Sequence, residues 1–182
     1  MKNHLITSLK VLGVFTVLLG FIYPVAITLV AQGLFGKQAN GSLVENGGRV
    51  IGSSLLAQKT VSEKYFWPRP SASDYGAVPS GASNLGYTSK ALKQAVDERK
   101  AIGLTHDLLF TSGSGLDPHI SMDAALSQVP RIVQSRLLSE NDKIKVVDLI
   151  QRFYERRDFG IFGEPRINVL LLNIEMDKTF SN

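Results

Sequence analysis

The sequence contains no cysteine. This absence excludes a disulfide framework and any metal site built on thiolates, and it is compatible with either side of a membrane. Histidine is scarce, and His106 and His119 lack the helical spacing of a metal-binding pair. No Gly-Lys-Ser/Thr triplet is present, so a GxxxxGK[ST] phosphate-binding loop is excluded. We therefore expect no metal ligand, and no residue can be assigned to nucleotide binding.

A strong excess of charge of one sign is also missing. The chain has 20 Lys and Arg residues against 16 Asp and Glu residues, a net charge of +4, and the basic residues are dispersed. Nucleic-acid-binding domains usually concentrate basic residues on one face. We therefore expect no nucleic-acid partner.

One long stretch has no charged residue. It runs from Val11 to Gly36, between Lys10 and Lys37. A helix needs about 20 apolar residues to cross a hydrocarbon core, whereas the apolar region of a cleavable signal peptide has only about 7–15. The sequence therefore predicts a cytoplasmic arm at 1–10, a single transmembrane helix at 11–36 and a domain at 37–182.

Two features of this apolar run concern packing and orientation. Pro24 removes one backbone hydrogen bond and predicts a kink. Gly13 and Gly20, seven residues apart with Thr16 nearby, predict close packing against partner helices. The numbers of basic residues on the two sides of the apolar run are nearly equal, so the positive-inside rule gives no clear orientation. The very short arm favours a cytoplasmic N-terminus and an exported domain.

The remainder of the chain predicts a small mixed α/β domain. Asn46-Gly47-Gly48 is typical of a hairpin turn, and a short helix is expected to start within Ser53–Gln58. Three further helices are expected, beginning after Thr88 or Ser89, at Ser121, and at Ser139 with a capping box to Asp142. Two apolar runs predict strands, at His106–Thr111 and, buried on both faces, at Ile167–Ile174.

Apolar residues spaced by three or four predict the buried face of each of these three helices. The expected faces are Leu92, Ala95, Val96 and Arg99; then Met122, Ala125, Leu126, Val129, Ile132, Val133 and Leu137; then Ile144, Val147, Ile150, Phe153 and Tyr154.

Residues 65–89 contain aromatic, proline, serine and glycine residues in a mixture that cannot form a long regular element. One interpretation is an ordered loop fixed to the core by Tyr65, Phe66 and Trp67. The other is a partner-binding loop, because long loops inside compact domains are often functional. Composition leaves both open.

Residues 112–119 contain serines, Asp117 and His119, the residue types of a nucleophilic triad. Neither Ser112 nor Ser114 has glycine two residues before and two after it, as a nucleophile elbow requires. An Asx-type turn explains these residues more simply, so no catalytic residue is assigned. A membrane-anchored hydrolase using Ser114 and His119, or an extracytoplasmic ligand-binding module, remains the alternative.

Six sequence features, the apolar run and five motifs after it, occur in a characteristic order. After the N-terminal anchor come YFWPRPSA (65–72), SGASNLG (80–86), TSGSGLDPHIS (111–121), AALSQVPRI (124–132) and FGEPRINVLLLNIEMD (162–177). This series resembles the C-subunit family of the bacterial Kdp potassium-transporting ATPases over essentially the whole chain. Ala82 and residues 87–89 depart from the family pattern, which affects the expected loop geometry.

The resemblance implies an accessory, non-catalytic subunit of an ATP-driven potassium uptake pump in the bacterial cytoplasmic membrane, with the main domain outside. The implied partners are a channel-like potassium-translocating subunit, a P-type ATPase subunit and a small single-helix subunit. ATP and potassium would be handled by the complex, with no cofactor bound by this chain. Members are described as catalytic chaperones that raise ATP affinity; since ATP is cytoplasmic, we expect that effect to be indirect, through coupled conformations.

We further expect the loops at 65–72, 80–86 and 112–119 to form one docking surface for the channel-like subunit. Interfaces favour aromatic and arginine anchors, so Trp67 and Arg69 are the foremost candidates. Asp117 is expected mainly to hold its loop in shape. The full candidate set for partner contact is Phe66, Trp67, Arg69, Ser83, Asn84, Ser114 and Asp117.

Overall fold

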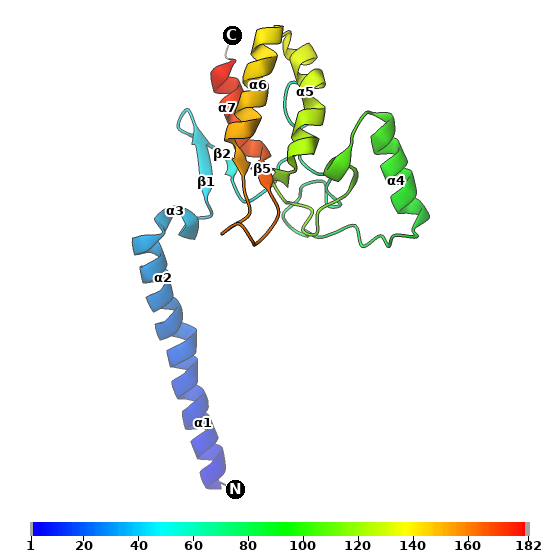
Figure 1. Ribbon diagram of the computed structural model, residues 1–182. Helices are drawn as coiled ribbons and strands as arrows, with labels where there is room; N and C mark the ends of the chain where they lie inside the picture. Colours follow the sequence, from blue (N-terminus) through cyan, green and yellow to red (C-terminus); the bar gives the residue numbers. More distant parts are fainter. Residues whose placement is uncertain (1, 181–182) are drawn as a thin grey trace. The chain divides into compact units, whose positions relative to one another are not determined.

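The computed structural model describes residues 2–180 (Figure 1). The chain forms two compact units, the first ending at Leu43 and the second beginning at Val44.

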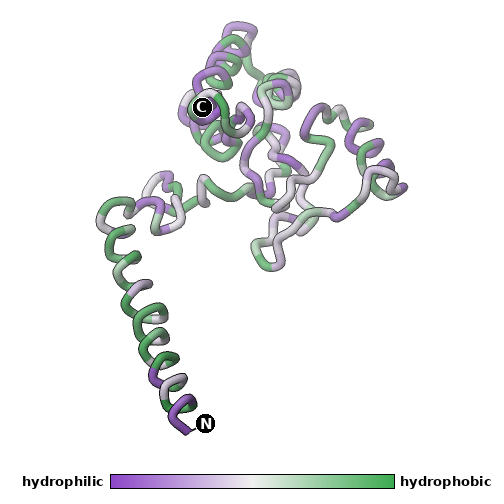
Figure 2. The backbone as a smooth tube through the Cα atoms, turned by 60° about the horizontal axis from the view of Figure 1, so that its bottom comes forward, coloured by the Kyte–Doolittle hydropathy of each residue, from purple (hydrophilic) through white to green (hydrophobic). Residues whose placement is uncertain are grey.

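The first unit is a long apolar helix followed by one short helical turn. Its parts are α1 (Lys2–Val17), the π-helical turn η1 (Leu18–Ile22), α2 (Tyr23–Leu34) and α3 (Gly36–Ala39). The continuous helix from Lys2 to Leu34 has 33 residues, and none of its most apolar window is buried. The mean hydropathy of that window is 2.3, and the helix is coloured as mostly hydrophobic in Figure 2. It is long and apolar enough to cross a membrane, as the sequence predicts.

The π-helical turn ends at Ile22, two residues before Pro24. Proline has no backbone N–H, and its ring collides with the carbonyl four residues earlier. The backbone N–H of Tyr23 instead binds the carbonyl of Leu18, five residues back. The disturbance expected at Pro24 therefore takes the form of a local π turn, a common way of accommodating such a break.

The chain then enters a two-stranded sheet made of β1 (Leu43–Asn46) and β2 (Arg49–Ser53). Gly47 and Gly48 form its turn with φ angles of 59° and 76°, which confirms the predicted hairpin. The helix expected within Ser53–Gln58 is wrong: a turn follows Ser53, whose hydroxyl accepts a hydrogen bond from the Leu55 N–H. Such side-chain bonds to nearby backbone groups compete with helix formation.

Four helices and three very short strands make up most of the second unit. In chain order these are α4 (Lys90–Ala101), the 3₁₀ turn η2 (His106–Leu109), β3 (His119–Ile120), α5 (Met122–Arg136), α6 (Glu140–Arg152), β4 (Tyr154–Glu155), β5 (Arg166–Asn168) and α7 (Val169–Thr179). The strands form an antiparallel sheet in the order β3-β5-β4, with Ile167 facing Ile120 on one side and Tyr154 on the other. The predicted mixed α/β class is confirmed.

The core lies where α5, α6 and α7 pack together above this small sheet (Figure 1). Its fully buried side chains include Phe66, Leu108, Ile120, Ile132, Val146, Ile150, Ile167, Leu172 and Met176. The expected caps are confirmed: Ser89, Ser121 and Ser139 each accept a backbone hydrogen bond at a helix start, and Ser139 forms the capping box with Asp142.

The first predicted strand is wrong, and the second is correct only for Ile167 and Asn168. His106–Thr111 contains η2, because the Asp107 carboxylate turns toward the start of α5 and accepts hydrogen bonds from the Ser121 N–H and hydroxyl. The run at Ile167–Ile174 is mostly helix: β5 ends at Asn168, whose side chain caps α7 by accepting from the Leu171 N–H. A short apolar run fits a buried strand or a buried helix equally well.

Three residues expected on buried helix faces lie in solvent. Leu126 is 39% exposed, Leu137 is 92% exposed and Ile144 is 68% exposed. Leu137 lies beyond the last turn of α5 in a left-handed conformation, so it leaves the helical face. The face expected to be buried on α4 is only half-buried, and no residue of that helix is fully buried.

Candidate functional site

Side-chain amides form hydrogen bonds with the backbone of the loop that begins at Tyr65, as a neighbouring strand would in a sheet. Asn173 of α7 accepts from the Phe66 N–H at 2.8 Å and donates to the Phe66 carbonyl at 2.9 Å. Gln128 of α5 does the same for Trp67, at 2.8 and 3.2 Å. These pairs satisfy backbone groups that are costly to leave unpaired. They fix the loop while the Phe66 ring fills the core.

Two arginines of α5 also hold this loop in place. Arg131 donates to the Tyr65 carbonyl at 3.0 Å and stacks 3.8 Å from the Trp67 ring centroid. Arg136 lies 4.9 Å from the Tyr65 ring and donates to Asp177 at 2.6 Å. Burial lowers the pKa of Arg131. Burial, reinforced by the hydrogen bond to Asp177, raises the pKa of the Tyr65 phenol.

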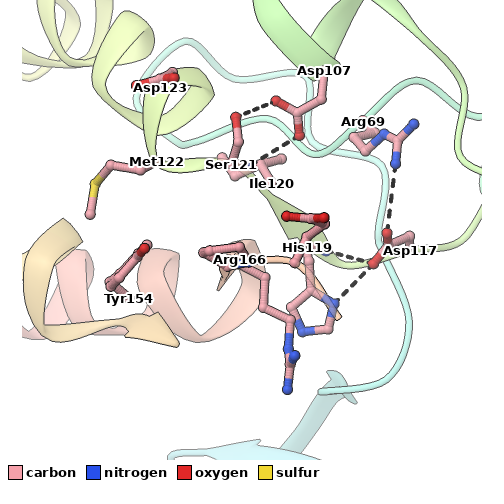
Figure 3. Close-up of a pocket in the computed structure, with 12 residues that line it drawn as sticks. Arg69, Asp107, Asp117, His119, Ile120, Ser121, Met122, Asp123, Tyr154 and Arg166 are labelled. Carbon is pink, nitrogen blue, oxygen red and sulfur yellow. Dashed lines mark hydrogen bonds and ion pairs between the residues drawn. The ribbon is translucent and has the colours of Figure 1, made fainter. Parts of the chain in front are cut away.

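Arg69 joins this loop to the segment after η2. Its guanidinium donates to the carbonyls of Phe110 and Thr111, both at 3.3 Å, and lies 3.8 Å from the Asp117 carboxylate (Figure 3). Arginine suits this position because its planar head presents several donors at fixed angles. Arg69 therefore connects three backbone segments of the domain.

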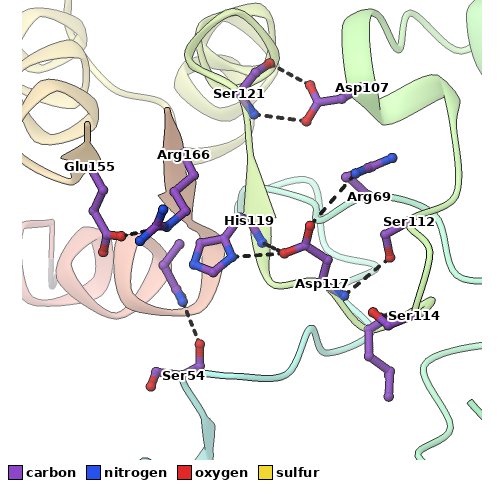
Figure 4. A network of polar contacts seen from close by, with 12 residues as sticks. Ser54, Arg69, Asp107, Ser112, Ser114, Asp117, His119, Ser121, Glu155 and Arg166 are labelled. Atoms are coloured by element: carbon purple, nitrogen blue, oxygen red, sulfur yellow. Dashed lines mark hydrogen bonds and ion pairs between the residues drawn. The ribbon is translucent and has the colours of Figure 1, made fainter. Parts of the chain in front are cut away.

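Asp117 organises the loop at 112–119. Its carboxylate accepts from the His119 N–H at 3.0 Å and lies 2.9 Å from His119 Nδ1 (Figure 4). Its own N–H donates to the Ser112 hydroxyl. Burial disfavours the ionised form, but the hydrogen bonds from His119 and the nearby positive charge of Arg69 outweigh it and lower the pKa of Asp117. This matches the shape-holding role expected for Asp117.

An open cleft of about 620 Å³ lies beside this network. Arg69, Asp117 and His119 line it together with Asp107 and Ser121 (Figure 3). Its remaining walls are Ile120, Met122, Asp123, Tyr154, Glu164, Pro165 and Arg166. Among residues 2–180 no group of three or more His, Cys, Asp or Glu side chains could hold a metal ion.

The arrangement of Ser114 does not fit nucleophilic catalysis. Asp117 and His119 pair as the second and third members of a triad would. The Ser114 hydroxyl, however, accepts from the Leu116 N–H at 3.1 Å in a local turn, and no hydrogen bond joins it to His119 within the described part of the chain. The loop thus has the turn geometry that the sequence favours over an elbow.

The three loops expected to form one surface do meet. A Cβ atom added at Gly115 would lie 2.7 Å from the Gly81 carbonyl oxygen and 3.3 Å from the Ser71 hydroxyl, and Gly115 has a φ of 68°. Only glycine fits this conformation and this close approach. Loops 65–72, 80–86 and 112–119 therefore pack together around Gly115.

The candidate contact residues differ in how much surface they offer. Ser114 and Asn84 are exposed, and Ser83 and Asp117 are half-buried. Trp67 and Arg69 are also half-buried and bind within the domain. Phe66 has no exposed surface, so in this conformation its side chain contacts only the core. Contact with a partner stays a prediction for the others.

In the first unit, the four residues proposed for helix packing have no tertiary neighbours within it. Gly13, Thr16, Gly20 and Pro24 are all exposed, and a Cβ atom added at either glycine would meet nothing within 4 Å. Their packing against another helix remains a prediction.

Sequence reasoning missed the buried amides of Gln128 and Asn168, the half-buried amide of Asn173 and the carboxylate of Asp107. Asn168 donates to the Ser54 carbonyl at 2.8 Å, which ties β5 to the segment after β2. For Gln128 and Asn173 the available signal was a polar residue inside an apolar helical stripe. Buried polar groups of this kind need a partner.

Comparison with known sequences places this architecture in a family. The sequence model of KdpC, described as "K+-transporting ATPase, c chain", matches residues 5–178. The chain belongs to the KdpC family. The match includes the apolar helix and nearly all of the second unit, so it covers both parts of the fold.

Full-length relatives agree with this assignment. A protein of Leptospira interrogans is 43% identical, covering 98% of this chain and 95% of its own length. Proteins of Rhodospirillum rubrum and Sorangium cellulosum are each 45% identical, covering 99% and 97% of this chain and 98% of their own lengths. All three are named potassium-transporting ATPase KdpC subunits.

Proposed function

We propose that this chain is the accessory, non-catalytic subunit of a high-affinity, ATP-driven potassium uptake pump. The observation that carries the proposal is the family match across residues 5–178, supported by full-length relatives named as subunits of a potassium-transporting ATPase. The apolar 33-residue helix agrees with membrane association. The role of the chain is to assemble and stabilise the complex.

The partners are a channel-like potassium-translocating subunit, a P-type ATPase subunit and a small single-helix subunit. The N-terminus lies in the cytoplasm and the second unit lies outside the cytoplasmic membrane. Gly13, Thr16 and Gly20, which are exposed in the isolated chain, pack against partner helices, because small residues allow backbones to approach closely.

Any effect on ATP is indirect. The sequence has no phosphate-binding loop, and the exported domain is separated from cytoplasmic ATP by the membrane. Binding at one site raises the affinity at another when both favour the same state of the complex. The chain therefore supports ATP binding by stabilising one conformation of the P-type subunit, and it binds neither ATP nor potassium as its own cofactor.

The surface that docks on the channel-like subunit is the group of loops around Gly115. Their mutual packing supports this proposal, since Ser114 and Asn84 are exposed on loops that the structure holds in defined positions. A pre-ordered loop loses less conformational entropy on binding than a flexible one.

The test is co-purification. The tagged full-length chain is expressed with its three proposed partners, and the membranes are solubilised in mild detergent. We expect all three partners to elute with the chain; a chain that elutes alone, while the other three still purify together, contradicts the proposal.

Trp67→Ala and Arg69→Glu are compared for yield of complex and for melting temperature of the full chain. Lost assembly at a normal melting temperature assigns these side chains to the interface; loss of both assigns them to the domain interior.

A further inference from the structure

The loop between β4 and β5 carries the most exposed cluster of large apolar side chains in the second unit outside the loops discussed above. Phe159 is 93% exposed, Ile161 is 72% exposed and Phe162 is 65% exposed. We call these three residues the apolar tip. Single exposed apolar residues are common, but three within four positions of one loop indicate a binding role.

The apolar tip is ordered by its own backbone. Asp158 and Phe162 exchange two hydrogen bonds, each of 2.9 Å, and the Gly160 N–H binds the Arg157 carbonyl. Phe159 adopts a φ of 54°, which is unfavourable for a residue with a large side chain. A strained backbone and an exposed aromatic ring at the same residue both point to function.

The charges at the base of the tip compensate one another. Glu155 pairs with Arg166 at 3.0 Å, Asp158 with Arg166 at 3.4 Å, and Glu164 with Arg157 at 2.7 Å. Arg156 is exposed and has no ion pair within the described residues. The surface next to the tip therefore offers no unpaired carboxylate that an anionic membrane would repel.

We propose that the apolar tip inserts into the headgroup–acyl boundary of the bilayer. The inference rests on the membrane anchoring given above as part of the proposed function. Only eight residues, 35–42, join the anchor helix to β1, and eight residues span at most about 28 Å. A domain of this size has a radius of gyration of about 14 Å, so the tether keeps its surface within reach of the bilayer.

The size of the tip favours lipid over a protein partner. A stable protein interface buries about 800 Å² on each partner, far more than three side chains on one turn provide. Aromatic and aliphatic side chains beside arginine are the composition that lies at the boundary between headgroups and acyl chains, where apolar groups enter by about 5–10 Å.

The absence of cysteine permits a direct test. Single-cysteine variants of the full-length chain are spin-labelled and reconstituted alone in vesicles of phosphatidylethanolamine and phosphatidylglycerol. Phe159→Cys reports on the tip. Leu137→Cys is the matched control, because Leu137 is 92% exposed but isolated at the end of α5. Val17→Cys reports on the anchor. Collision of each label with lipid-soluble oxygen and with a water-soluble nickel chelate is measured.

The label at residue 159 is expected to collide mainly with oxygen, like the label at 17, and the label at 137 mainly with nickel. Equal nickel accessibility at 159 and 137 overturns the inference, provided that the label at 17 lies in lipid. Protection of 159 from both reagents also overturns it, since that result indicates a second copy of the chain as the occupant. A water-accessible label at 17 refutes the membrane anchor itself, and hence the topology under the proposed function.

Discussion

At the scale of single residues, the loop that begins at Tyr65 depends on a few polar side chains. Asn173 and Gln128 each use both ends of an amide to satisfy one residue of that loop. The pattern resembles one rung of a β-ladder made by side chains. It lets a segment without secondary structure carry the buried Phe66 ring.

Asn173→Leu should therefore destabilise the domain. It removes the partners of the Phe66 N–H and carbonyl, and each buried unpaired group costs about 1–3 kcal/mol. The measurement is the thermal melting of the full-length chain in detergent. Asn141→Leu, at an exposed position in the first turn of α6, is the matched control and should change the melting temperature little. Equal effects of the two substitutions would contradict this account of the loop.

Asp117→Asn should destabilise the domain in a pH-dependent way. Because the folded structure lowers the pKa of Asp117, ionised Asp117 contributes stability above its unfolded pKa of about 3.9. That contribution is lost as the pH falls through the lower folded pKa. Melting curves of the wild type and the variant should differ most at neutral pH and converge under acidic conditions. A difference that grows on acidification would refute the assigned ion pairing.

At the scale of elements, the sequence was informative where side chains act locally. The hairpin at Gly47-Gly48 and the caps at Ser89, Ser121 and Ser139 were predictable, because turn and cap preferences depend on a few adjacent residues. The single long helix was predictable from length and hydropathy.

The incorrect predictions concern segments whose structure depends on contacts with residues distant in the sequence. The segment around Asp107 forms η2 instead of a strand, because the Asp107 carboxylate accepts a hydrogen bond from the hydroxyl of Ser121, 14 residues away. Asn168 divides an apolar run into a short strand and α7 because β3 and β4 lie on either side of β5. Of the proposed site, the grouping of three loops was predictable from their shared composition. The internal roles of Trp67 and Arg69 were not, since their partners come from α5 and from the segment after η2.

The membrane helix supplies a prediction at this scale. Replacing Gly13 and Gly20 by Leu should weaken co-purification with the partner subunits, because bulky side chains keep helices apart. Leucine has a higher helix propensity than glycine, so the helix itself should not be weakened. Val25→Leu with Val30→Leu, at other exposed positions of α2, is the control. Unchanged yield of complex with the glycine variant would argue against helix packing at these positions.

At the scale of the whole molecule, the proposed topology places the two units in different environments. In cells that produce the full-length chain, Leu137→Cys should react with a membrane-impermeant maleimide added outside, and Asn3→Cys should react only after lysis. Both positions are exposed in the isolated chain. The reverse labelling pattern would show an inverted orientation and would remove the reason for calling the effect on ATP indirect.

The central claim is that this chain is required by a potassium pump without performing its chemistry. The most direct measurement is potassium-stimulated ATP hydrolysis by purified complexes made with and without the chain, and with Ser114→Ala in its place. We predict that the complete complex hydrolyses ATP and that the complex with Ser114→Ala has normal activity. When the chain is omitted, we predict that hydrolysis is lost or that it requires a much higher ATP concentration. Full potassium-stimulated hydrolysis at unchanged ATP dependence without the chain would contradict the claim.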